Sequence, residues 1–309
     1  MISRQYRILA WSTFVGMLFV LLAGAIVTQT GSGRGCGSDW PLCHGKFIPA
    51  YTLESMIEYS HRMITGIVGL LVLLTFILTW FHRREHREAY AYAGGTLLFT
   101  VIQALMGAAA VKWPQQPAVM ALHFGISLLA VASSMMLVLW IYRMKQTDRQ
   151  SVQTPPGFAV WAWAIWVFTY GVIYLGAFIR HREAAGGCIG WPLCNGRLVP
   201  DFNEVAGVVF AHRLAAVLLF ILTAIWALLV RRAEHKNQAS GMGTAVSYLL
   251  LCILFQIMSG AWLTAALDRG DELLFVSLLH NIIATILFSL LTDIAVRSWI
   301  YRRKETSHP

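Results

Sequence analysis

The sequence is short of charge. Only 13% of its 309 residues are Asp, Glu, Lys or Arg, whereas 57% are hydrophobic and the mean hydropathy is +0.61. Soluble domains usually carry roughly 25% charged residues. A chain this poor in charge has too few polar side chains to cover a surface in water. The shortage excludes an ordinary soluble globular protein and indicates an integral membrane protein.

The sequence also lacks a concentrated basic patch, although its net charge is +9. The Lys and Arg residues stand in short clusters between apolar runs, not interleaved with aromatic residues as in nucleic-acid-binding proteins. Many of the 12 Trp and 10 Tyr residues lie near the ends of those runs. This is typical of the aromatic belts at membrane–water interfaces. The composition therefore favours the lipid bilayer as a partner and argues against nucleic acid.

Apolar runs of about 20 residues, the length that crosses a bilayer, occur eight times. The predicted segments are Ile8–Val27, Met63–Phe81, Ala91–Val111, Ala118–Tyr142, Phe158–Ile179, Val205–Val230, Thr244–Leu267 and Leu273–Ile300. Lys and Arg are twice as frequent in the short loops on the N-terminal side as on the other side. The positive-inside rule thus predicts a multi-pass protein of the cell membrane with both termini in the cytoplasm. The loops 28–62 and 180–204 then face outward.

The sequence contains an internal repeat. Trp40–Arg62 aligns without a gap with Trp191–Arg213, and eight of the 23 positions are identical. The likeness continues from Gln103–Ala108 to Gln256–Ala261, and His123 corresponds to His280. A repeat of this length indicates two copies of one structural unit. We expect an all-α integral membrane protein with eight transmembrane helices in two tandem, pseudo-symmetric four-helix bundles, residues 1–142 and 158–309, joined by a cytoplasmic linker at 143–157.

Four histidines lie near the outer ends of the even-numbered segments: His61, His123, His212 and His280. Ionisable residues within membrane segments are costly and are therefore candidates for function. Two histidines on separate helices of one bundle suit the two axial positions of a haem iron. Zinc usually takes three or four ligands, which these pairs do not supply. The pattern predicts one haem site in each half, with Arg62 and Arg213 placed to bind the haem propionates.

Cysteine is scarce, and four of the five cysteines lie in the two outward loops. Because that side is oxidising, we expect the disulfides Cys36–Cys43 and Cys188–Cys194. The second is interpreted as a structural staple. For the first, two interpretations stay open: a staple over the haem slot, or a redox-active pair that exchanges electrons with the site below. Cys252, inside the seventh segment, is interpreted as a small apolar filler.

The two halves differ next to the first histidine of each pair. Glu58 stands three residues before His61, on the same helical face, whereas Val209 occupies that position before His212. A carboxylate beside an apolar slot can activate water or stabilise developing positive charge. The alternative is a solvated acid at a helix start, where the helix dipole favours it. We expect the first half to perform chemistry on its haem and the second to hold haem as a fixed redox cofactor.

These motifs together resemble haem A synthases of the bacterial type. They are Thr30–Gly33, Cys36, Trp40–Cys43, Glu58–Arg62, Ala121–His123, Trp191–Cys194, Ala211–Arg213 and Leu279–Asn281. The resemblance implies an oxidoreductase that converts the C8 methyl group of its substrate, haem O, to a formyl group, giving haem A. It implies a haem b cofactor at His212 and His280, a substrate haem between His61 and His123, and Glu58 as the catalytic carboxylate. A hydrophobic substrate also favours direct hand-over from a haem O synthase partner.

Three other kinds of protein compete with this interpretation. A diheme b-type electron-transfer protein accounts for the histidine pairs but gives no reason for a glutamate in one half alone. A membrane thiol oxidase accounts for the cysteines and leaves the four histidines without a role. A transporter built on repeats would usually show helices broken near the membrane midplane, whereas these apolar runs are continuous.

Overall fold

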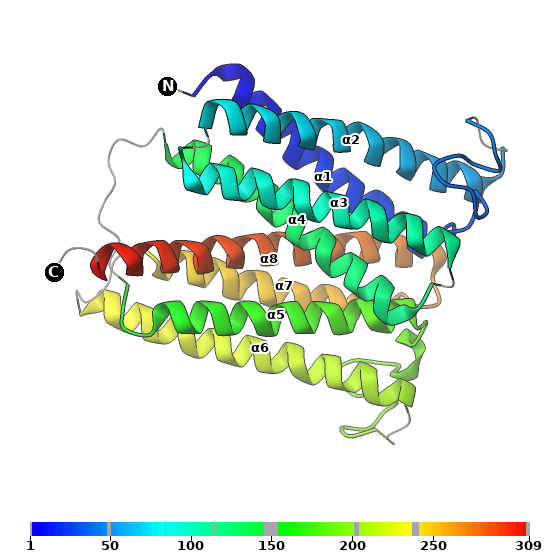
Figure 1. Ribbon diagram of the computed structural model, residues 1–309. Helices are drawn as coiled ribbons and strands as arrows, with labels where there is room; N and C mark the ends of the chain where they lie inside the picture. The colour runs from blue at the N-terminus through cyan, green and yellow to red at the C-terminus, as the bar shows by residue number, and fades with distance from the viewer. Residues whose placement is uncertain are drawn as a thin grey trace. The chain divides into compact units, whose positions relative to one another are not determined.

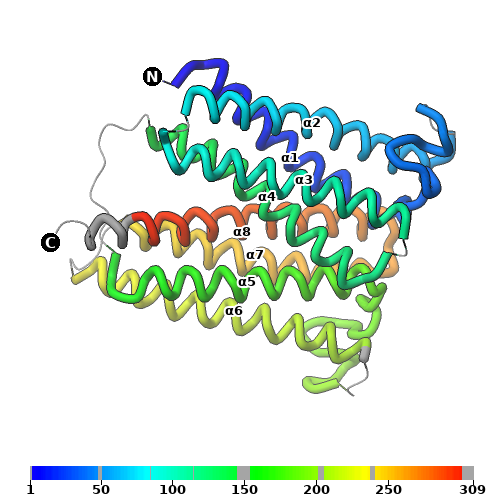
Figure 2. The backbone as a smooth tube through the Cα atoms, in the orientation of Figure 1, coloured from blue at the N-terminus to red at the C-terminus, as the bar shows by residue number. Residues whose placement is uncertain are grey.

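The computed structural model describes residues 2–47, 51–83, 85–113, 115–144, 154–200, 204–236 and 241–306 (Figures 1 and 2). Over these ranges the elements are α1 (Arg4–Gln29), α2 (Leu53–Arg83), α3 (Arg87–Lys112), α4 (Pro117–Arg143), α5 (Phe158–His181), the short 3-10 helix η1 (Ala185–Gly187), α6 (Glu204–His235), α7 (Gly243–Ala265) and α8 (Gly270–Thr306). The eight α-helices are all long and apolar enough to cross a membrane. This confirms the predicted all-α protein with eight membrane-spanning helices.

The chain divides into two compact units, Met1–Thr147 and Asp148–Pro309. The division falls in the predicted linker, of which residues 145–153 lie outside the described residues. In the first unit, α1 and α3 each contact both α2 and α4, and in the second, α5 and α7 each contact both α6 and α8. Each unit is therefore a four-helix bundle in which the two histidine-bearing helices occupy opposite corners. Within each unit these two helices start at the same end of the bundle (Figure 2).

The first histidine-bearing helix begins earlier than its apolar run alone suggests, whereas α4 and α6 begin within one residue of the predicted start. Helix α2 starts at Leu53, ten residues before the predicted segment, directly after Thr52, whose hydroxyl accepts a hydrogen bond from the backbone N–H of Ser55 at 3.3 Å. Such a hydroxyl compensates a helix-start N–H that has no partner within the helix. His61 and His212 are each the ninth residue of their helices, so both lie inside regular helix, about 12 Å from its start.

The interior of the first bundle is held in part by hydrogen bonds between α1 and α2. The Tyr6 hydroxyl lies 2.7 Å from the Thr79 hydroxyl, and the hydroxyls of Thr13 and Thr75 are also 2.7 Å apart. All four side chains are buried. Lipid gives helices little hydrophobic reason to associate, so close packing and such hydrogen bonds contribute much of the helix–helix attraction.

The second bundle fills the same repeat positions with apolar side chains. Phe158 and Val230 replace the Tyr6–Thr79 pair, and Ile165 and Trp226 replace the Thr13–Thr75 pair. All four belong to the main buried cluster of this unit, in which the rings of Phe158 and Trp226 lie 5.0 Å apart between centroids. The two bundles therefore share a backbone plan but are stabilised by different interior chemistry.

Replacement of Trp226 by alanine is expected to destabilise the second bundle by about 3 kcal/mol, because truncation of a buried aromatic side chain leaves a cavity. Thermal unfolding of the purified protein in detergent measures the loss. Trp299→Ala is the matched control, since the Trp299 side chain is 48% exposed and that of Trp226 only 1%. Equal losses in the two variants would contradict the assignment of Trp226 to the core.

Candidate functional site

Each of the four histidines lies against a glycine of the preceding helix. In the first helix pair of each unit, His61 faces Gly24 of α1 and His212 faces Gly176 of α5. A Cβ atom added at Gly24 would lie 3.4 Å from Cε1 of His61, and one added at Gly176 would lie 2.9 Å from Cε1 of His212. Any larger residue at Gly176 would thus push the imidazole aside. The glycines provide the space in which the rings lie.

The second helix pair of each unit repeats this arrangement. A Cβ atom added at Gly107 of α3 would lie 3.9 Å from Cε1 of His123, and one at Gly260 of α7 would lie 3.4 Å from Cε1 of His280. Gly107 and Gly260 are equivalent by the repeat, as are the two glycines of the first pair. Sequence reasoning missed this role, although the repeat carried the signal: glycines recur at equivalent positions on helices without histidines.

Side chains of α7 hold the imidazole of His280 at both nitrogens. Nδ1 lies 2.8 Å from the Ser259 hydroxyl oxygen, and Nε2 lies 2.9 Å from the side-chain nitrogen of Gln256. On the diagonally opposite helix α6, His212 lies correspondingly against Gly176 of α5. The second bundle therefore directs two imidazoles from opposite corners into one region of its interior.

In the first bundle, the glutamine equivalent to Gln256 contacts the backbone of the histidine instead of its ring. The Gln103 side chain donates to the carbonyl oxygen of His123 at 2.7 Å and accepts from the Ser127 hydroxyl at 2.9 Å. Nδ1 of His61 is buried and has no hydrogen-bond partner among the residues that the structure describes. An imidazole in such a place is available to a group that enters the bundle.

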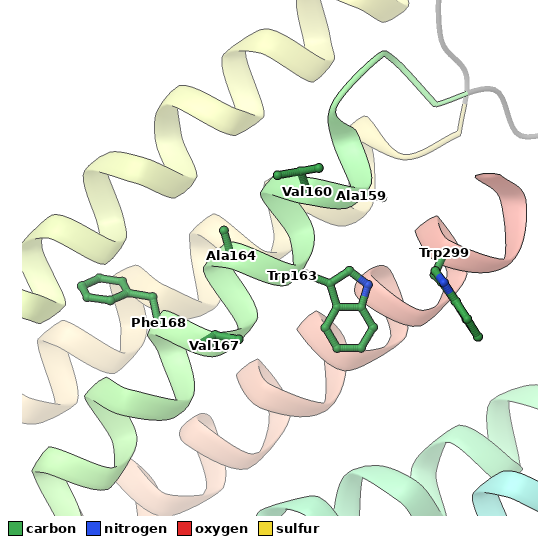
Figure 3. A pocket seen from close by; sticks show the side chains of 7 residues that line it. All are labelled: Ala159, Val160, Trp163, Ala164, Val167, Phe168 and Trp299. Atoms are coloured by element: carbon green, nitrogen blue, oxygen red, sulfur yellow. The ribbon is translucent and has the colours of Figure 1, made fainter. Parts of the chain in front are cut away.

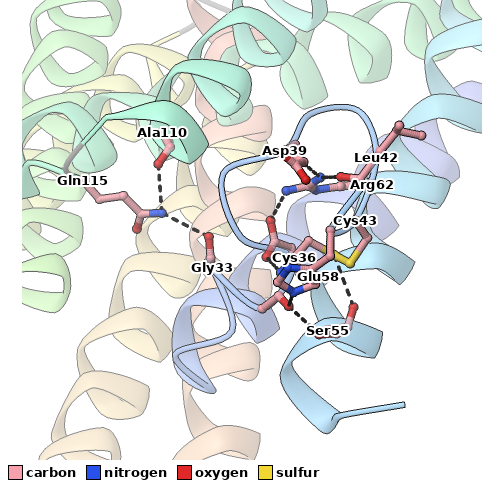
Figure 4. A network of polar contacts seen from close by, with 12 residues as sticks. Gly33, Cys36, Asp39, Leu42, Cys43, Ser55, Glu58, Arg62, Ala110 and Gln115 are labelled. Carbon is pink, nitrogen blue, oxygen red and sulfur yellow. Dashed lines mark hydrogen bonds and ion pairs between the residues drawn. A yellow bond between two sulfur atoms is a disulfide. The ribbon is translucent and has the colours of Figure 1, made fainter. Parts of the chain in front are cut away.

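Glu58 is buried, with only 4% of its surface exposed, and both of its carboxylate oxygens are engaged (Figure 4). One accepts the backbone N–H of Cys36 at 2.8 Å, and the other accepts a guanidinium N–H of Arg62 at 2.5 Å. Burial and these two donors exclude the alternative of a freely solvated acid at a helix start. Val209, at the same position of the second bundle, packs instead into an apolar cluster with Cys188 and Cys194.

The two long loops that precede α2 and α6 are each closed by a disulfide, Cys36–Cys43 and Cys188–Cys194, as predicted. In each unit, the arginine that directly follows the first histidine donates hydrogen bonds to backbone carbonyl oxygens of the loop. Arg62 donates to the carbonyl oxygens of Asp39 and Leu42 at 2.7 and 2.6 Å (Figure 4). Arg213 donates correspondingly to those of Cys188 and Leu193 at 2.7 and 3.2 Å. In this structure both arginines hold the loops, and their contact with propionates stays a prediction.

The loops share further details of conformation. His44 and Asn195 occupy equivalent positions in the left-handed region, with φ of 50° and 55°. The side chain of His44 lies 3.1 Å from the carbonyl oxygen of Gly35, and that of Asn195 donates to the carbonyl oxygen of Gly187 at 3.0 Å. A Cβ atom on either glycine would collide with the backbone at the start of α2 or α6. The glycines thus allow each loop to lie directly on the helix that carries the histidine.

No other part of the described chain offers a comparable group of chemically active side chains. Within the described ranges, no three His, Cys, Asp or Glu side chains gather as ligands for a metal ion. An apolar pocket between α5 and α8 lies at the opposite end of the second bundle (Figure 3). Its lining holds no titratable group: Ala159, Val160, Trp163, Ala164, Val167, Phe168 and Trp299. The candidate site is therefore the histidine-bearing end of each bundle with its disulfide loop.

Comparison with known proteins finds one family model that matches most of the chain and relatives that match almost all of it. Residues 50–292 match the model of the COX15-CtaA family, described as cytochrome oxidase assembly protein. A haem A synthase from Exiguobacterium sibiricum is 38% identical over 299 residues, which cover 96% of each chain. Haem A synthases from Alkalihalophilus pseudofirmus and Bacillus cereus are 36% and 37% identical, over 94% of this chain and 96% and 92% of theirs.

Because the two arginines hold the loops, replacing either one should change the rate at which the disulfide of its loop is reduced. Arg62→Lys removes the planar fork that holds two loop carbonyls, and hydrogen bonds from charged donors are worth about 1.5–3 kcal/mol. We expect dithiothreitol to reduce Cys36–Cys43 about tenfold faster in this variant, as followed by alkylation with a mass tag. Arg213→Lys should accelerate only the reduction of Cys188–Cys194. Unchanged rates in both variants would show that the arginines do not hold the loops.

Proposed function

Because the chain belongs to the haem A synthase family, we propose that it oxidises the C8 methyl group of haem O to a formyl group. It is an enzyme of haem A biosynthesis, embedded in the bilayer and acting on a haem substrate. The conversion of a methyl group and one water molecule into a formyl group releases four electrons and four protons. The chain must therefore bind the substrate, place water at the methyl carbon, stabilise positive charge there, and pass four electrons to an external oxidant while four protons leave.

The observation that carries this proposal is the difference between Glu58 and Val209. Both bundles have histidines against glycines and a disulfide loop held by an arginine, but only the first has a buried carboxylate there. A diheme electron-transfer protein gives no reason for this glutamate. A haem that is chemically altered in one half and retained in the other accounts for such an asymmetry.

The second bundle has the features that a haem b cofactor requires. His212 and His280 come from helices at opposite corners of the bundle, and Gly176 and Gly260 give their rings space. We propose that these two histidines hold haem b through its iron. When bound, haem b supplies one-electron oxidation and reduction at a fixed position.

In the first bundle we propose that haem O lies between His61 and His123. Glu58 is one helical turn from His61 and on the same face of α2. The Cys36 N–H and the Arg62 guanidinium fix the position of its carboxylate, and each oxygen keeps a lone pair for a further hydrogen bond. Glu58 can thus accept a proton from water or stabilise positive charge at the reacting carbon without first changing its orientation.

We further propose that both chain ends lie in the cytoplasm and that the chain resides in the cell membrane. The disulfide loops then face the oxidising side, where such bonds persist. Haem O is too apolar to travel freely through water, so direct hand-over from a haem O synthase suits this arrangement. The role of the Cys36–Cys43 pair in electron transfer remains a hypothesis beside its role as a staple.

Replacement of Glu58 by glutamine should abolish haem A formation while leaving the fold intact. General acid–base groups typically contribute about 10²–10⁴-fold to a rate, and the amide keeps the size but loses the basicity. The measurement is chromatography of haems extracted from membranes of a host that makes haem O and lacks its own haem A synthase.

The control is Glu54→Gln, one turn earlier on α2, where the side chain is exposed. It should leave the haem A yield unchanged. A normal yield from Glu58→Gln at normal protein levels would remove Glu58 from the mechanism.

Alanine at Gly176 should weaken retention of haem b. The added Cβ would lie 2.9 Å from Cε1 of His212, and overpacking of this kind costs about 1–3 kcal/mol, or about tenfold or more in affinity. Pyridine-haemochrome analysis of the purified variant measures the haem b retained per chain. Gly171→Ala on the same helix meets no atom within 4 Å and should retain haem b fully. Full retention by both variants would place the cofactor elsewhere.

A further inference from the structure

The hydrogen bonds around His280 indicate which of its nitrogens carries the proton. The hydrogen-bond partner of Nε2 is the amide nitrogen of Gln256, at 2.9 Å, and an amide nitrogen can only donate. Nε2 must therefore be the acceptor, which places the ring proton on Nδ1. The contact of Nδ1 with Ser259, at 2.8 Å, agrees with this assignment.

The Ser259 hydroxyl is oriented to receive that proton. It lies 3.0 Å from the carbonyl oxygen of Gln256, to which it donates its own hydrogen, so its oxygen is free to accept from Nδ1–H. Ser259 is 4% exposed, so water does not compete for the contact. It also adjoins Gly260, which makes space for the ring. The pair Ser259-Gly260 thus sets both the position and the protonation pattern of the imidazole.

We propose that Ser259 is a positioning residue that holds His280 in the tautomer able to bind the haem b iron through Nε2; this inference rests on the proposed function. A histidine ligand commonly donates its second ring N–H to a neighbouring acceptor, which fixes the ring and raises its basicity. Haem binding then replaces the single donor, the Gln256 amide, that Nε2 has in this structure.

The repeat shows that this device belongs to the second bundle alone. Met106 occupies the position of Ser259 in the first bundle, and a thioether is at most a weak acceptor. Gln103, at the position of Gln256, donates to the backbone of His123 instead of a ring. A strongly fixed ligand suits a cofactor that stays bound, whereas a substrate haem must enter and its product must leave. Ser259 is thus a further chemical difference between the site that retains its haem and the site that exchanges substrate haem for product.

The test compares wild-type protein with Ser259→Ala and Ser259→Thr, each purified with haem B bound. We expect Ser259→Ala to lower the affinity for haem B about 10- to 100-fold, measured as haem transfer to apomyoglobin. The reduction potential should rise, because a less basic imidazole stabilises ferric iron less, and the low-spin ferric resonance spectrum should shift. Ser259→Thr keeps the hydroxyl and should restore all three properties. Ser247→Ala, on the same helix, should match wild type.

Two results would overturn the inference while leaving the proposed function intact. One is a Ser259→Ala protein with wild-type affinity, potential and spectrum. The other is a Ser259→Thr protein as impaired as the alanine variant, which would indicate a packing role. If Ser259→Ala does not accumulate, Ser259→Cys tests the same point with a weaker acceptor of similar size. A wild-type protein that retains no haem B with two histidine ligands would instead refute the cofactor site itself.

Discussion

The architecture depends on space for an imidazole between two closely packed helices. In a bilayer, helices associate through close packing of small residues, so a planar ring at a helix contact requires a glycine opposite. Each bundle meets this requirement twice, with Gly24 and Gly107 in the first and Gly176 and Gly260 in the second. The start of α2 at Leu53 and that of α6 at Glu204 place His61 and His212 inside regular helix, where their positions are fixed.

Around this shared geometry the interiors of the two bundles have diverged. At some repeat positions the first bundle is polar and the second apolar: Tyr6 corresponds to Phe158, and Glu58 to Val209. At other positions the order is reversed, because Ser259 takes the place of Met106 and the buried Thr169 that of Met17. Next to the histidines, the first bundle thus carries a buried carboxylate and the second a hydroxyl that contacts an imidazole.

The sequence was sufficient for the helices, the duplication and the disulfide pairs, because long apolar runs, a gapless repeat and paired cysteines are local signals. It was insufficient wherever a residue's role depends on its partner. The contact of Arg62 with a propionate stays a prediction, but its hydrogen bonds to Glu58 and the loop carbonyls were not predicted, because they depend on how the loop folds over α2. The glycine–histidine contacts join different helices, so the repeat marks the glycines but does not name their partners.

The loop clamp is a feature that both halves share. Arg62 and Arg213 donate to the equivalent carbonyl oxygens of Leu42 and Leu193, so this contact holds the loop in both bundles. In the first bundle, however, the same guanidinium also binds Glu58, and the backbone of the disulfide loop donates to it through Cys36. The clamp that holds the loop thereby also holds the carboxylate. With the scaffold present in both halves, the identity of one residue, Glu58 or Val209, decides whether a bundle holds a fixed carboxylate beside its first histidine.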